Sequence, residues 1–189
     1  MNDSLYMRIV TSTAHRESRF NNAGHILENI SELQDLITFG CTINDNQHHK
    51  AMWILEIVVE KNTVAFVPYL QQFCNTLQLW KDVGAQRSAA KIAMIAVIAN
   101  SQTSILNEQQ LQQLTEQCFD WLIGDSKVAV KVYAIYALGE AGLSNKWIYA
   151  ELEQILLKDY GDQSPGYKAA ARKALKRIHS KKVKNQFLG

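Results

Sequence analysis

Apolar residues recur three or four positions apart along most of the chain, which is the spacing of one face of an α-helix. Four such stripes each mark the first helix of a predicted pair: Leu33, Leu36 and Ile37; Leu70, Phe73 and Leu77; Leu111, Leu114 and Cys118; and Ile148, Leu152, Ile155 and Leu156. No long alternating run and no Asn-Gly turn competes with them, so the pattern predicts an all-α chain without strands.

A second set of four segments repeats one pattern that begins at a basic anchor. The anchors are Lys50, Arg87, Lys131 and Lys168, which are 37, 44 and 37 residues apart. In the last three copies alanine follows three and six positions later, at Ala90 and Ala93, Ala134 and Ala137, and Ala171 and Ala174. Alanine at a helix crossing lets two backbones approach closely, and the period suits a repeat of two helices.

The first copy of this pattern departs from the rule, because Trp53 and Glu56 occupy its two alanine positions. We expect this copy either to pack differently or to expose a face. Glu56 and Glu60 lie one helical turn apart, and such a pair is usually a solvated face, although Glu56 could also line an inner surface.

Boundary signals agree with the helix pattern. Asn107 with Gln110 predicts a capping box, and Ser164 followed by Pro165 predicts the start of the last helix. Pro68 either lies in a helical first turn or kinks its helix. At the N-terminus the pattern predicts helices over residues 16–28 and, less regularly, over residues 3–12.

An acidic residue precedes each basic anchor, in the predicted turn between paired helices. The pairs are Asp45 and Lys50, Asp82 and Arg87, Asp125 and Lys131, and Asp162 and Lys168. This recurrence resembles the HEAT repeat, in which a turn aspartate and a second-helix arginine form a ladder. The resemblance covers about residues 30–180. It implies a right-handed α-α superhelix of about five antiparallel helix pairs (HEAT/ARM-like), with the second helices on the concave side.

The stretch over residues 118–131 is also similar to short bacterial HEAT-like proteins, some of which are labelled adenylosuccinate lyase. The chain of 189 residues is too short for that enzyme and has no Gly-rich, Met- and Lys-containing lyase loop, so we set the label aside. We expect one domain over residues 1–189, with irregular helices in 1–29, four repeats in 30–181 and a basic tail in 182–189.

Charge is unevenly distributed along the chain. Residues 1–162 hold 12 Lys/Arg against 18 Asp/Glu, a balance of −6, whereas residues 163–189 hold 8 Lys/Arg and no acid. Two rows of the last helix carry this charge: Lys168, Arg172 and Lys176; and Lys173, Arg177 and Lys181, extended by Lys182 and Lys184. This basic helix is either the polar cap of the terminal repeat or a contact surface for phosphate or an acidic partner.

Signatures of targeting and of chemistry are scarce. The sequence begins without a signal peptide and contains no apolar run of membrane length, so we expect a cytoplasmic protein with no membrane contact. Cys41, Cys74 and Cys118 are expected to be buried, reduced thiols. Adjacent His48 and His49 point to different helix faces, and CxxC, HExxH, GxSxG and phosphate-loop motifs are absent; we predict no metal and no cofactor.

These observations predict a non-catalytic scaffold that binds a protein or peptide on its concave surface. The candidate partner-binding residues are Trp53, Glu56, Lys91, Lys131, Arg172, Lys176 and Arg177. Nucleic-acid binding through the basic C-terminal helix is the alternative. A base-excision DNA glycosylase is a third hypothesis, for which Trp53 and Glu56 are the available aromatic and acid. The four tryptophans, Trp53, Trp80, Trp121 and Trp147, otherwise suggest core packing.

Overall fold

The computed structural model describes residues 3–187, with side chains described for residues 3–180, and this part of the chain is all-helical without strands. Two short helices begin it, α1 (Asp3–Thr11) and α2 (Arg16–Glu28). Both lie where the apolar pattern predicts helices, which confirms these two N-terminal predictions.

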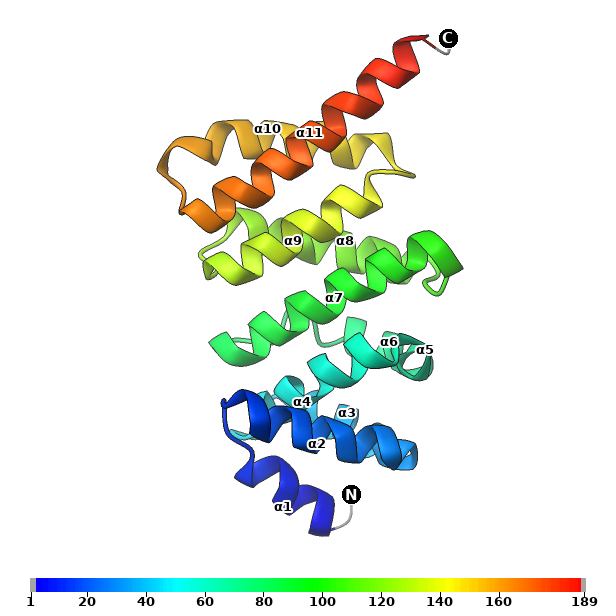
Figure 1. Ribbon diagram of the computed structural model, residues 1–189, viewed down its shortest axis with the longest axis vertical. Coiled ribbons are helices and arrows are strands. Elements are labelled where there is room, and N and C mark those ends of the chain that lie inside the picture. The colour runs from blue at the N-terminus through cyan, green and yellow to red at the C-terminus, as the bar shows by residue number, and fades with distance from the viewer. Residues whose placement is uncertain (1–2, 188–189) are drawn as a thin grey trace.

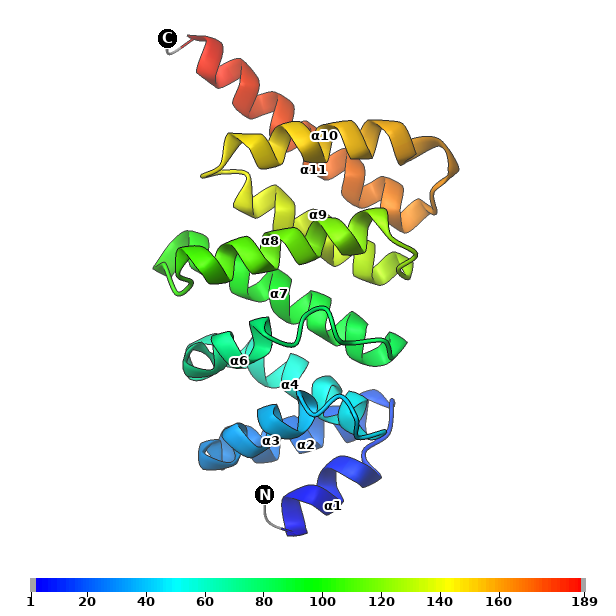
Figure 2. The same cartoon turned by 180° about the vertical axis from the view of Figure 1, so that it is seen from behind.

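The helices stack in two layers along one axis, which Figures 1 and 2 show from opposite sides. In what we call the B layer, each helix packs on the next in the order α2, α4 (His48–Lys61), α7 (Val83–Thr103), α9 (Val128–Ala141) and α11 (Pro165–Phe187). The A layer holds α3 (Leu33–Gly40), α5 (Thr63–Phe66), α6 (Leu70–Cys74), α8 (Glu108–Ile123) and α10 (Lys146–Asp159). Short 3-10 turns over Ile30–Glu32, Val67–Tyr69 and Tyr160–Asp162 complete the chain.

Helix ends lie close to the predicted capping residues. The side chain of Asn107 accepts from the Gln110 backbone N–H at 2.8 Å, and the side chain of Gln110 accepts from the Asn107 N–H at 3.1 Å. This capping box satisfies two amides that α8 would otherwise leave unpaired. Pro165 begins α11, and the hydroxyl of Ser164 accepts from the Tyr167 N–H at 3.4 Å.

Pro68 breaks the helical path before α7. It lies in the 3-10 turn between α5 and α6, because proline has no N–H to donate and its ring clashes with the preceding turn. The first helix of this repeat is therefore divided into two short α-helices, α5 and α6, with one 3-10 turn between them.

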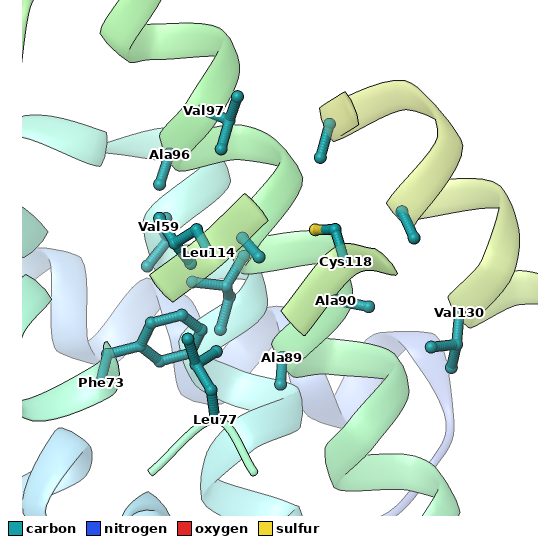
Figure 3. Close-up of a cluster of buried hydrophobic side chains, with 14 of the residues drawn as sticks. Val59, Phe73, Leu77, Ala89, Ala90, Ala96, Val97, Leu114, Cys118 and Val130 are labelled. Atoms are coloured by element: carbon teal, nitrogen blue, oxygen red, sulfur yellow. The ribbon is translucent and has the colours of Figure 1, made fainter. Parts of the chain in front are cut away.

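The alanines of the repeat are buried in the B-layer helices. Ala90, Ala134 and Ala171, three positions after their anchors, are fully buried. Figure 3 shows Ala90 and Ala96 of α7 within the hydrophobic cluster that joins the two layers, with Phe73 of α6 and Leu114 of α8. Small side chains at these positions let the larger neighbours of both layers interdigitate.

The three cysteines are free, and Cys74 and Cys118 are buried. Burial raises the pKa of both thiols to about 12, since an apolar environment disfavours the thiolate. Burial also raises the pKa of Cys41, although the hydroxyl of Thr76, 3.6 Å from its sulfur, opposes part of that effect.

All three thiols should therefore be protonated and slow to react at neutral pH. With Ellman's reagent we expect the folded protein to release little colour, Cys41 to react first, and all three thiols to react once urea unfolds the chain. Rapid stoichiometric labelling of the folded protein would contradict this packing.

Gly142 ends α9 at a point where no side chain fits. A Cβ atom at this position would lie 2.0 Å from Cδ1 of Tyr149, whose ring is buried and whose hydroxyl donates to the Gly139 carbonyl at 3.1 Å. We expect Gly142→Ala to lower the free energy of unfolding by about 2–3 kcal/mol, because the ring must move within a packed core. Chemical denaturation measures this change.

Gly24, inside α2, is the matched control, because no described atom outside the local backbone of α2 lies within 4 Å of the position that a Cβ atom would occupy there. Gly24→Ala should raise the free energy of unfolding by about 0.5–1 kcal/mol through helix propensity. Equal effects of the two substitutions would show that the contact with Tyr149 is not the cause.

Candidate functional site

The carboxylate of Glu56, on α4, is buried between α4 and α7, with 3% of its side chain exposed. Three donors of α7 satisfy it. Arg87 Nη1 at 3.0 Å and Ser88 Oγ at 2.7 Å donate to Oε2, and Lys91 Nζ lies 3.2 Å from Oε1. A buried anion needs such compensation. The expectation of a solvated face at Glu56 is therefore corrected: this carboxylate joins two helices.

Lys91 is committed to the same cluster. Its Nζ also donates to Oε2 of Glu60, at 3.0 Å. Burial lowers the pKa of Lys91, but the hydrogen bonds and charges of Glu60 and Glu56 outweigh that desolvation, so the pKa lies above its ordinary value. Lys91 is thus a protonated link within the B layer, whereas the sequence suggested it as a partner contact.

Similar links continue along the B layer. Arg87 of α7 donates from Nη2 to the hydroxyl of Tyr133 on α9 at 3.4 Å, and its guanidinium lies 5.9 Å from the centre of that ring. Between α9 and α11, Arg177 Nη1 donates to Glu140 Oε2 at 2.8 Å. In both ion-paired interfaces the acid belongs to the earlier helix and the cations belong to the later one.

These links replace the pairing predicted within each repeat. None of the pairs Asp45–Lys50, Asp82–Arg87, Asp125–Lys131 and Asp162–Lys168 forms an ion pair among the described residues. Asp82 instead caps α7 by accepting from the Ala85 N–H at 2.8 Å. An acid at a helix start faces the backbone amides of the first turn, and the anchor five residues later points toward the neighbouring helix.

The other anchors find backbone partners or none. Lys50 Nζ donates to the carbonyl of Val10, which ties α4 to the end of α1. Lys168 Nζ donates to the Gly161 carbonyl at 2.8 Å. Lys131 is half-buried, and no ion pair to it forms within the described side chains.

An open groove of about 640 Å³ lies where α7, α9 and α11 run side by side (Figure 1). Its volume falls in the range of about 300–1,000 Å³ typical of ligand sites. The apolar part of its lining comes from all three helices: Met94 and Ile98 from α7, Ile135 from α9 and Ala174 from α11. Its polar lining includes Tyr136, Glu140, Lys173, Lys176 and Arg177.

The charged lining is mostly cationic. Glu140 is paired with Arg177, and their side chains are 14% and 41% exposed. The ammonium of Lys173 lies 5.2 Å from the centre of the Tyr136 ring, a cation–π contact. Lys176 is exposed and has no acidic partner among the described side chains. Two cations are therefore left without a countercharge beside an apolar surface.

Some of the predicted partner-binding residues line the groove and others lie outside it. Lys176 and Arg177 line the groove, whereas Arg172 is exposed on α11 outside its lining. Trp53 is half-buried on α4, where its ring contacts His49 edge-on at 4.8 Å. Gly84 at the start of α7 makes room for Trp53, because a Cβ there would lie 2.8 Å from its Nε1.

The tryptophans differ in how deeply they are buried. Trp80 and Trp121 are buried, as their apolar surroundings suggested. Trp147 is instead 53% exposed at the start of α10, with its ring stacked on Phe119 of α8 at 5.8 Å. Core packing is thus the wrong interpretation for Trp147, whose indole is largely exposed although it stacks on Phe119.

Sequence reasoning did not single out most of the groove lining, including Met94, Tyr136 and Glu140. Met94 lies seven positions after the anchor Arg87, is half-buried and lines the groove. Tyr136 carried no signal of its own. The only signal for Glu140 in the sequence is its spacing from Arg177, which lies 37 residues later in the second helix of the following repeat.

Within the described side chains no group of three His, Cys, Asp or Glu residues is placed to hold a metal ion. None of the described helices combines the length and the apolar character needed to cross a membrane. No protein-family model, curated protein or solved structure shows significant similarity to this chain.

The role of Glu56 can be tested through stability. We expect Glu56→Ala to lower the free energy of unfolding by about 2–3 kcal/mol, since it leaves Arg87, Ser88 and Lys91 without their shared acceptor. Glu60→Ala, at a 46% exposed carboxylate of the same helix, should cost less than about 1 kcal/mol. Equal losses in urea titrations would contradict the buried link.

Proposed function

We propose that this chain is a HEAT-like α-solenoid that acts as a non-catalytic interaction scaffold. The support is the ordered packing of the B-layer helices, their buried alanines and the period of 37 to 44 residues. In this proposal the stack is a right-handed superhelix whose repeats span residues 30–181, with the B layer on its concave side. Free cysteines are in keeping with a cytoplasmic setting.

The groove between α7, α9 and α11 is the observation that carries the proposal. Three neighbouring B-layer helices supply its lining. A hydrogen bond from Arg87 to Tyr133 links α7 to α9, and the Glu140–Arg177 ion pair links α9 to α11. A site on packed helices is formed before its partner arrives, so binding loses little conformational entropy. We propose that a protein or peptide partner occupies this groove.

The surroundings of Glu56 do not favour a catalytic role. A glycosylase would use Glu56 as its acid beside Trp53. Glu56 already accepts from Arg87 and Ser88 and lies 3.2 Å from Lys91 Nζ, while 3% of its side chain is exposed. A carboxylate held in this way supports a structural role better than proton transfer to a bound base.

Nucleic-acid binding remains the second candidate because α11 is so basic. Residues 163–180 contain Lys168, Arg172, Lys173, Lys176 and Arg177 and no acid. Lys168 and Arg177 are already engaged by Gly161 and Glu140, which reduces the charge left for phosphates.

The test is affinity capture with the tagged chain and two double variants. Met94→Gln with Ile98→Gln removes apolar lining of the groove, whereas Ile123→Gln with Leu157→Gln changes two exposed A-layer side chains outside it. We expect a stoichiometric partner to be captured by the wild type and by the A-layer variant. The groove variant should retain about a tenth of it, because two lost apolar contacts are worth roughly 1.5–3 kcal/mol.

Circular dichroism should show that both variants keep their helix content and thermal transition. A partner retained equally by both double variants would contradict the groove as the binding site. A partner lost on nuclease treatment, with binding that falls steeply as salt rises, would favour the nucleic-acid alternative.

A further inference from the structure

We propose that the occupant of the α7–α9–α11 groove is an acidic amphipathic helix of a partner protein. This inference rests on the proposed function and names the chemistry of the partner. Its apolar face would lie on Met94 and Ile98, and its carboxylates would meet Lys173 and Lys176.

The charge of the occupant follows from the unpaired cations. Glu140 is the one acid in the groove lining, and Arg177 neutralises it at 2.8 Å. Lys173 and Lys176 remain, and no acid of residues 163–180 competes for them because this segment has none. Such cations beside a groove attract a carboxylate and repel a basic segment.

The apolar character of the occupant follows from the lining. Met94 and Ile98 are one helical turn apart on α7, and Ile135 and Ala174 continue the surface on α9 and α11. Methionine adapts its shape to different side chains, and lysine stems add apolar contact while their ammonium groups stay in water. A stripe of this kind fits the i, i+3 and i+4 side chains of an amphipathic helix.

A nucleic acid matches the same cations less well. Binding of single strands draws on aromatic faces that are free for bases, and the ring of Tyr136 is already paired with Lys173. An apolar lining also contributes little against phosphates. The combination of unpaired lysines and apolar side chains thus favours a carboxylate-bearing helix.

The experiment uses the full chain and a fluorescent synthetic peptide of about 16 residues, long enough to form a helix on binding. Leucines at helical spacing give it an apolar face, and glutamates fill the other positions. Two control peptides separate the contributions: one replaces every glutamate by glutamine, and the other is polyglutamate. Fluorescence anisotropy measures affinity, and circular dichroism measures the helix gained by the peptide.

We expect the acidic amphipathic peptide to bind and to gain helix, and both control peptides to bind at least about tenfold more weakly. Lys173→Glu with Lys176→Glu should weaken binding by about tenfold or more. Lys146→Glu with Lys158→Glu makes the same charge change at two exposed A-layer lysines and should leave the affinity within about twofold.

Several outcomes would overturn the inference. Equal binding of the glutamine peptide would make the contact purely apolar, and equal binding of polyglutamate would make it purely electrostatic. Tighter binding of a DNA oligonucleotide that displaces the peptide would assign the lysines to phosphate. The captured cellular partner separates the two proposals. If the Met94→Gln, Ile98→Gln variant loses this partner and the Lys173→Glu, Lys176→Glu variant still binds it, the scaffold function is supported and the acidic nature of the partner is contradicted.

Discussion

Close approach of neighbouring B-layer helices is the constraint on which the rest of the structure depends. Ala90, Ala134 and Ala171 are fully buried in α7, α9 and α11, and a small side chain allows a neighbouring helix to approach closely. Because the backbones are near one another, side chains one turn away can reach across the interface. The ion links and the groove both follow from that spacing.

The first copy of the repeat shows how the layer tolerates an exception. Glu56 occupies a position where later copies have alanine, and its carboxylate is bound by Arg87, Ser88 and Lys91 of α7. A buried ion cluster contributes less net stability than its geometry suggests, since desolvation offsets the attraction. We infer that the cluster fixes the register of α4 against α7, because a shift of either helix along the other would move the three donors away from the carboxylate.

The groove combines features that a structural cap of the stack does not need. A cap requires polar groups toward water, whereas Lys173 and Lys176 flank Met94 and Ile98 in one open site. Acids and cations are also segregated, with a body of −6 and a last helix without acids. Packed helices hold the groove in place, so in the proposed function its selectivity would reside in the side chains of α7, α9 and α11.

Periodicity and capping residues determined the helices themselves, because α2, the capping box at Asn107 and the start of α11 depend on local sequence. Repeat offsets likewise identified the buried alanines. Tertiary structure alone decided which charges meet: Arg87 reaches back to Glu56 instead of pairing with Asp82. It also decided that Trp147 is exposed and that Met94 lines a groove. Sequence spacing reports the face of one helix, whereas partners and exposure depend on how two helices cross.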